Sequence, residues 1–370
     1  MKNNQRTIHV REILSTIEDF APLSLQESYD NAGLICGSPD AAVKSILLTT
    51  DITEEVVDEA IEDGHNLIIS HHPLTLQGLK NLRPDSYIQR CLIKAIRHEL
   101  NIYSAHTNLD SVMQGVSGRM ADKLGLRNRK ILQPSGQLLC FSFYTPISQA
   151  EKVRQAIFDI GGGYIGGYSH CSYNQEGVGT FLAKEGCHPT VGQIGTLHRE
   201  KEIKTEITIP TYLLQKSIQA LLKVHPYEEP VWNIIPLSNP NPVNGFGIIG
   251  ELPEAVESHS FLQQIKTVFH CQTIRHTSLC KSQIRKVAVC GGAGAFLTSR
   301  AIAQGADIYI TGDYKYHDFF QAENRLIIAD IGHYESEQFT KEIFYELVTK
   351  KIPNFAIQFS KIETNPIHYL

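Results

Sequence analysis

The first third of the chain alternates short apolar runs with segments of helical spacing. Residues 45–50, 66–70 and 101–105 have apolar centres and the length of buried strands. Between them, apolar residues recur at helical spacing over 53–63 and 85–100. The order strand, helix, strand, helix, strand predicts a parallel sheet built with right-handed crossovers.

The last third returns to the same pattern. Residues 286–290 predict a strand that leads through the glycine turn 291–294 into a helix, and residues 306–313 and 326–329 predict two more strands. After them, residues 333–348 have helical spacing. The two ends of the chain therefore predict one α/β core made of two parts.

The middle of the chain breaks this pattern and predicts a separate domain. Strand, helix, strand, helix and strand are expected in turn at 138–144, 147–160, 204–210, 213–224 and 231–236. One further strand between 160 and 204 would complete a ferredoxin-like α+β fold. We therefore predict a first core half at 1–128, an inserted ferredoxin-like domain at 129–242, and a second core half at 243–370.

Histidines and an aspartate follow two of the predicted parallel strands. His71 and His72 come directly after one strand, and His106 and Asp110 follow the next. Ligands of open α/β sheets bind at the carboxyl ends of the strands. Imidazoles and carboxylates are the ligands of zinc, manganese and ferrous iron, and the absence of cysteine argues against a closed structural zinc site. Adjacent histidines at a strand end point in different directions, which favours two metal ions side by side.

A second pair of ionisable residues lies near the end of the chain. His333 and Glu337 are about 40° apart on a helix and fall on its apolar face. Buried ionisable groups are costly unless they are paired, hydrogen-bonded or bound to a metal. An ion pair at the first turn of the helix is the alternative. The upstream histidines favour a metal site.

Four other segments have two interpretations each. Residues 27–37 are either a turn-rich connection or a loop that lines the site. The glycine cluster at 161–167 lacks a following helix, so a turn is favoured over a dinucleotide site, and the turn at 291–294 is either a tight turn or an anion site. For His225-Pro-Tyr-Glu-Glu-Pro230, a loop at a helix end with exposed acids is favoured over a metal site.

Composition narrows the class of protein. The 370 residues are 42% hydrophobic and 20% charged, with a net charge of -5, as in globular proteins that bind neither membranes nor nucleic acid through a general basic surface. No run reaches the length of a membrane span. Eight scattered cysteines without a C-x-x-C pair, and a start without an apolar signal core, predict a cytoplasmic protein with reduced thiols.

Five motifs together resemble those of a known family over nearly the whole chain. They are Tyr29-Asp-Asn-Ala-Gly-Leu, His71-His-Pro, Ala105-His-Thr-Asn-Leu-Asp, Thr311-Gly-Asp-Tyr-Lys-Tyr-His and Asp330-Ile-Gly-His-Tyr-Glu-Ser-Glu. The chain is similar to the GTP cyclohydrolase 1 type 2 homologues, also called NGG-interacting factor three-like proteins. The resemblance includes the long bacterial form, whose inserted domain is similar to CutA and carries Val224-His-Pro-Tyr-Glu-Glu-Pro near its end. It therefore implies that the inserted domain is CutA-like.

The resemblance implies a dinuclear metal site. Matched by motif, the ligands are His71, His72, Asp110, His333 and Glu337. Glu337 is expected to bridge the ions. The resemblance also implies that His106 lines the site and handles protons. Glu337 is expected to help orient the attacking water, so His106 and Glu337 are both catalytic candidates. Zinc is the first expectation for the two divalent ions, with iron and manganese as alternatives.

Two functions follow from the resemblance and the residues. The first is a metal-dependent hydrolase of a nucleotide-like substrate, with ring opening of GTP and formate release as the reaction that the family name suggests, or hydrolysis of a phosphate ester. The second is a non-catalytic metal-binding or regulatory protein whose insert senses a small molecule.

The resemblance further implies a homohexamer built as a trimer of dimers. A ring that encloses nucleic acid is disfavoured by the acidic net charge.

Overall fold

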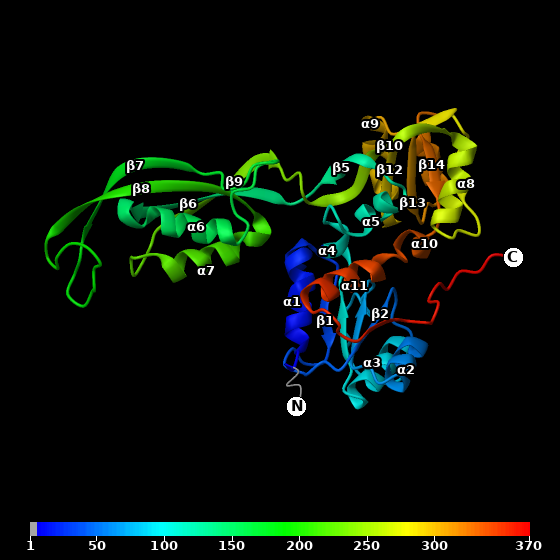
Figure 1. The fold of residues 1–370 in the computed structure, drawn as a ribbon, viewed down its shortest axis with the longest axis horizontal. Helices are drawn as coiled ribbons and strands as arrows, with labels where there is room; N and C mark the ends of the chain where they lie inside the picture. Colours follow the sequence, from blue (N-terminus) through cyan, green and yellow to red (C-terminus); the bar gives the residue numbers. More distant parts are fainter. Residues whose placement is uncertain (1–5) are drawn as a thin grey trace. The chain divides into compact units, whose positions relative to one another are not determined.

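A computed structural model describes residues 6–370, which form two compact units (Figure 1). One unit contains residues 135–242. The other unit contains the chain up to Pro134 and from Val243 onward. Each is described separately.

The first sheet of the larger unit has five strands in the order β1-β4-β3-β2-β15. Their bounds are Gly33–Cys36, Asn101–Ser104, Leu67–Ser70, Ile46–Thr49 and Ile357–Phe359. Strands β2, β3 and β4 are parallel, as the apolar runs predicted, and β1 is antiparallel to β4. β1 lies within residues 27–37, for which the sequence indicated only turns and a loop. The tertiary contact with β4 supplies the pairing that the local pattern does not encode.

Helices cover both faces of this sheet. They are α1 (Val10–Phe20), α2 (Glu54–Glu62), α3 (Tyr87–Arg97) and α11 (Thr340–Lys351). Alternate residues of β2 point to opposite faces: Ile46 and Leu48 pack with α1 and α11, whereas Leu47 packs with α2 and α3. The result is a three-layer α/β arrangement with a core on each side of the sheet.

The second sheet has six strands in the order β11-β14-β13-β12-β10-β5. Their bounds are Arg275–His276, Ile327–Asp330, Ile308–Gly312, Gln283–Ala293, Gly245–Glu257 and Arg127–Pro134. The three central strands β12, β13 and β14 are parallel. The helices of this part are α4 (Thr107–Asp110), α5 (Val116–Lys123), α8 (Ser258–Val268), α9 (Thr298–Ala303) and α10 (His333–Glu337). Helices α5 and α8 pack on one face and α9 on the other.

The segments before and after the inserted unit each contribute one strand to the sheet that is formed mainly by the other segment. β5 follows the first sheet in sequence but pairs with β10 of the second sheet, and β15 follows the second sheet but pairs with β2 of the first. Neither pairing was predicted. The predicted helix over 333–348 is also interrupted, since α10 ends at Glu337 and α11 starts at Thr340.

The smaller unit is a four-stranded antiparallel sheet with two helices on one face (Figure 1). Its elements are β6 (Gln137–Pro146), α6 (Ala150–Asp159), β7 (Tyr173–Leu182), β8 (Leu197–Pro210), α7 (Leu214–Val224) and β9 (Trp232–Pro240). The strand order is β7-β8-β6-β9. β7 is the strand that the sequence required but did not locate, because its residues are mostly exposed and lack an apolar alternation.

No helix within residues 6–370 is long and apolar enough to cross a membrane.

Candidate metal centre

The carboxyl ends of strands from both sheets of the larger unit bring six ionisable side chains together. His71 and His72 follow β3, and His106 lies between β4 and α4. Asp110 ends α4, while His333 and Glu337 begin and end α10 after β14. These six residues supply three groups of three ligand atoms, with all atoms of a group within 4.8 Å of one another. The sequence prediction that these residues meet is therefore supported by their positions.

The first group consists of His72, His333 and Glu337. The Nε2 atoms of the two histidines are 3.2 Å apart, and they lie 2.9 and 3.1 Å from Oε2 of Glu337. The other nitrogen of each ring contacts an aspartate. Nδ1 of His72 is 2.7 Å from Oδ1 of Asp51, and Nδ1 of His333 is 2.7 Å from Oδ2 of Asp313. A carboxylate behind each imidazole fixes its orientation and makes the other nitrogen a better metal ligand.

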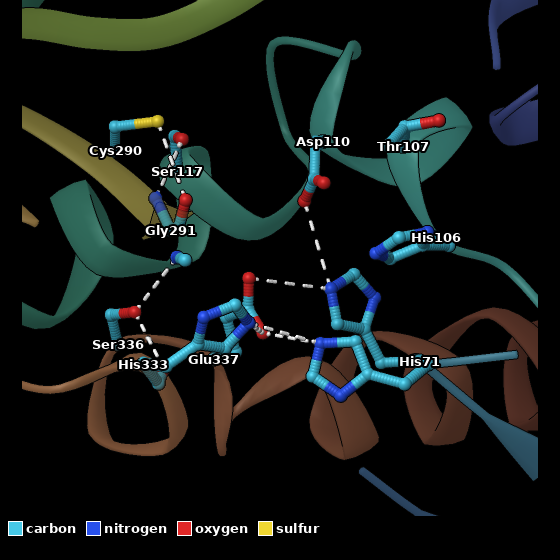
Figure 2. Close-up of polar contacts among 12 residues, drawn as sticks. His71, His106, Thr107, Asp110, Ser117, Cys290, Gly291, His333, Ser336 and Glu337 are labelled. Carbon is cyan, nitrogen blue, oxygen red and sulfur yellow. Dashed lines mark hydrogen bonds and ion pairs between the residues drawn. The ribbon is translucent and has the colours of Figure 1, made fainter. Parts of the chain in front are cut away.

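The second group consists of His71, Asp110 and Glu337. Nε2 of the fully buried His71 lies 3.8 Å from Oδ1 of Asp110 and 3.6 Å from Oε1 of Glu337. Figure 2 shows both carboxylates directed at this one nitrogen. Nδ1 of His71 is hydrogen-bonded to the carbonyl of Ala105 at 2.9 Å, so Nε2 is left for a ligand. Glu337 belongs to both groups.

Three buried atoms of this centre have no hydrogen-bond partner among the described residues. They are Nε2 of His71, Oδ1 of Asp110 and Oε2 of Glu337. An unpaired buried polar atom costs roughly 1–3 kcal/mol, so a native protein seldom leaves several of them next to each other. All three atoms are good ligands for a divalent cation. The donor set and the unpaired atoms therefore fit a bound metal.

Electrostatics couple the members of the centre. Burial and the nearby charge of Glu337 raise the pKa of Asp110 to about 7. Burial also opposes ionisation of Glu337, but the charges of His71 and the other histidines outweigh it and hold the pKa of Glu337 well below its usual range. Burial alone would lower the pKa of His72 and of His333; the charge of Glu337 and the orienting aspartates instead raise them to about 10 and about 11. A cation placed among these groups would replace the protons as the positive charge.

His106 stands beside the two groups and is held by a different carboxylate. Its Nδ1 lies 2.8 Å from Oδ1 of Asp30, whose other oxygen accepts hydrogen bonds from the backbone and hydroxyl of Thr107. These contacts lower the pKa of Asp30 to about 2 despite the opposing effect of burial. The His106 ring centroid is 5.4 Å from those of His71 and His72. Asp30 lies in the segment 27–37, so this segment lines the site.

Three orienting carboxylates were not assigned by sequence reasoning: Asp30, Asp51 and Asp313. Asp51 and Asp313 directly follow strand segments, which is a signal that could have identified them. Asp313 adopts a positive φ of 59°, an uncommon backbone conformation that is frequent at functional sites.

The glycines in the last residues of β12 make room for Glu337. The backbone N–H groups of Gly291 and Gly292 donate to the hydroxyls of Ser117 and Ser336, so these two donors are already used. A Cβ at Gly292 would lie 2.4 Å from Oε1 of Glu337. The anion-site interpretation of residues 291–294 is therefore disfavoured. Instead of the alternative tight turn, residues 291–293 form the irregular end of β12.

Gly292→Ala should weaken metal binding by about 10- to 100-fold, because the new methyl group would displace a carboxylate shared by both ligand groups. Gly305→Ala is the matched control: Gly305 has a similar φ of +73°, but a Cβ there would meet nothing within 4 Å. Metal affinity of both variants can be measured by competition with a fluorescent chelator. Equal affinities in the two variants would contradict the prediction.

Comparison with known proteins identifies the relatives of this chain. The model of the family described as Duf34/NIF3 (NGG1p interacting factor 3) matches residues 8–366. The chain is 36% identical over 364 residues to a GTP cyclohydrolase 1 type 2 homolog of Halalkalibacterium halodurans, a match that covers 97% of this chain and 98% of the relative. It is 32% identical over 376 residues to the Bacillus subtilis protein of the same name, covering 99% and 100%.

A solved structure is similar over the same extent. The crystal structure of a Bacillus cereus protein related to NIF3 matches with a TM-score of 0.84 and 36% identity, covering 99% of this chain and 100% of that one.

Proposed function

The chain belongs to the Duf34/NIF3 family, and from this premise we propose that it holds two divalent metal ions and hydrolyses a nucleotide-like substrate. The observation that carries the proposal is the pair of ligand groups that share Glu337, together with three buried atoms of these groups that have no hydrogen-bond partner among the described residues. A hydrolase needs a centre that both activates water and tolerates a growing negative charge, and two adjacent cations suit that purpose.

The five ligands would divide between two ions. His72 and His333 would hold one ion, His71 and Asp110 the other, and Glu337 would bridge them. Zinc fits this nitrogen and oxygen donor set, and iron and manganese are the alternatives. When bound, two such ions would lower the pKa of water and stabilise negative charge on the attacked group.

The protein's own groups would orient and move protons. Asp51 and Asp313 keep the rings of His72 and His333 in place, while Glu337 would orient the attacking water. His106 would exchange a proton through Nε2, because its Nδ1 is occupied by Asp30. A histidine backed by an aspartate is a common proton-transfer pair.

The substrate class is proposed from the names of the relatives, which are called GTP cyclohydrolase 1 type 2 homologs. In GTP ring opening, a first water adds to C8 of the purine and the imidazole ring opens to a formamide. A second water then adds to the formamide carbonyl, and the C–N bond breaks to release C8 as formate and leave a free amine. Both additions require an activated water and a proton donor, which the centre and His106 would provide.

The test combines metal analysis and product analysis on the same samples. Protein purified without chelator should contain about two ions per chain and release formate from GTP, and chelator treatment should abolish both until zinc or manganese is restored. An exposed-histidine variant, His259→Ala, should behave as the wild type. Two ions without formate would discard GTP ring opening and direct the search to phosphate esters. Protein without metal would overturn the proposal.

A second function is supported by a separate observation. A cavity of about 950 Å³ lies in the inserted unit, remote in sequence from the metal ligands. A non-catalytic metal-binding regulator whose insert senses a small molecule would use such a cavity. Absence of turnover with every metal tested would favour this alternative.

The remaining proposals come from the family resemblance. We propose that the inserted unit is CutA-like, that the chain forms a homohexamer arranged as a trimer of dimers, and that it works in the cytoplasm. All eight cysteines are free thiols, which agrees with a reducing compartment.

A further inference from the structure

The cavity of the inserted unit lies where β7 and β8 meet the connection between α7 and β9. Its volume of about 950 Å³ is at the upper end of the range of roughly 300–1,000 Å³ typical of small-molecule sites. Three aromatic residues and three carboxylates line it: Tyr144, Phe181, Tyr227, Glu202, Glu228 and Glu229. No lysine, arginine or histidine of the described chain is part of its lining. The cavity is therefore aromatic and acidic.

One of the carboxylates is fixed in position. Oε1 of Glu202 accepts a hydrogen bond of 2.7 Å from the hydroxyl of Tyr227. Its other oxygen lies over Gly179 of β7, where an added Cβ would be only 2.2 Å away. The hydroxyl of Tyr227 therefore fixes one oxygen of Glu202. The other oxygen packs against Gly179, where a larger residue would not fit. A carboxylate fixed in this way needs no rearrangement to receive a positive charge.

Aromatic rings stand next to this carboxylate. The ring centroids of Phe181 and Tyr227 are 6.4 Å apart in an edge-to-face arrangement. Aromatic faces attract ammonium groups, and the attraction is larger where water is partly excluded. An ammonium group bound beside these rings would therefore meet a ring face and the charge of Glu202.

The loop between β7 and β8 is fastened to the other side of the cavity. The backbone N–H of His188 donates to Oε2 of Glu228 at 3.2 Å, and the hydroxyl of Thr190 donates to the carbonyl of Pro226. These contacts explain the segment His225-Pro-Tyr-Glu-Glu-Pro230, which the sequence indicated only as a loop with exposed acids. The segment supplies a ring, two carboxylates and an anchor for the loop.

A metal ion is a poor match for this cavity. The three carboxylates do not form a ligand group: among the described residues, every set of three potential ligand atoms within 4.8 Å of one another belongs to the metal centre of the larger unit. A ligand that spreads its charge over a larger volume suits separated carboxylates and aromatic walls better than a compact ion does.

We propose that this cavity binds an organic cation, an ammonium group carried on an apolar body. Glu202 is the counter-charge, and Phe181 and Tyr227 are the aromatic walls. The inference does not rest on the hydrolase activity or on metal binding, since all the groups involved belong to the inserted unit.

Calorimetric titration of the full chain tests the proposal with two pairs of probes. Choline is compared with its neutral isostere 3,3-dimethyl-1-butanol, and 2-phenylethylamine with 2-phenylethanol. At least one ammonium probe should bind, and its neutral partner should bind at least about tenfold more weakly. Glu202→Gln, which keeps size and shape, should weaken binding of the ammonium probe by about tenfold or more.

Three further variants separate the site from general effects. Gly179→Ala leaves every charge in place but should displace Glu202 and cause a similar loss. Glu206→Gln changes a carboxylate of the same strand that pairs with Lys204 and does not line the cavity, so it should bind like the wild type. Glu337→Gln should also leave probe binding unchanged. Circular dichroism verifies that each variant is folded.

Two results would overturn the proposal. One is equal binding of an ammonium probe and its neutral partner, which would make the site simply apolar. The other is that neither ammonium probe binds at millimolar concentration. This result would overturn the proposal even if zinc bound to the protein in a way that depends on Glu202.

Discussion

Replacing Glu337 by glutamine should reduce the metal content from about two ions per chain to nearly none. Glu337 is the one residue that both ligand groups around His71 and His72 share. The substitution keeps the size of the side chain, but an amide carries no negative charge and offers a single weak oxygen donor. Four remaining ligands would then surround two cations with only the carboxylate of Asp110 as a counter-charge. Metal analysis of protein purified without chelator measures the effect.

His71→Ala serves as a graded comparison for the same measurement. His71 contacts Asp110 and Glu337, whereas the group of His72 and His333 does not include it, so about one ion should remain. Glu335→Gln is the matched control, because Glu335 is a buried carboxylate of the same helix that is bonded to Asn365 instead of to the histidines. A Glu337→Gln protein that retains two ions would show that Glu337 is not the bridge.

His106→Ala should lower turnover by about 10²- to 10⁴-fold while the metal content stays near that of the wild type. The reason is the contact between Nδ1 of His106 and Asp30, which leaves the other nitrogen for proton exchange. Asp30→Asn should cause a smaller loss, because an amide in place of the carboxylate orients Nδ1 of His106 less firmly. Turnover is measured as formate released from GTP, or as product from whichever ester the centre hydrolyses.

The controls for His106 address its position beside the ligands. Exogenous imidazole should partly restore turnover of His106→Ala, an effect that a purely structural role would not produce. His98→Ala removes an exposed histidine at the end of α3 and should have no effect. Since His106, His71 and His72 also form a group of three potential ligands, loss of an ion from His106→Ala would instead identify His106 as a ligand.

Local patterns were sufficient for much of the fold. Apolar runs and helical spacing located the parallel strands β2, β3 and β4 and the helices between them, because burial on both faces of a parallel sheet leaves a strong apolar signal. The element order of the inserted unit was also accessible, apart from the mostly exposed strand β7. Strand β1 and the pairing of β5 and β15 with the sheets of the opposite chain halves were not accessible.

The sequence by itself determined which residues of the candidate centre lie together. His71, His72, His106 and Asp110 follow neighbouring parallel strands, whose carboxyl ends must share one edge of the sheet. Only the tertiary structure decided how these side chains are oriented and grouped. Asp30, Asp51 and Asp313 reach the imidazoles from other segments, and β5 and β15 exchange between two sheets. Such contacts join residues far apart in the chain, so the local sequence pattern does not predict them. The periodicity of strands and helices, by contrast, directly indicates which residues are buried.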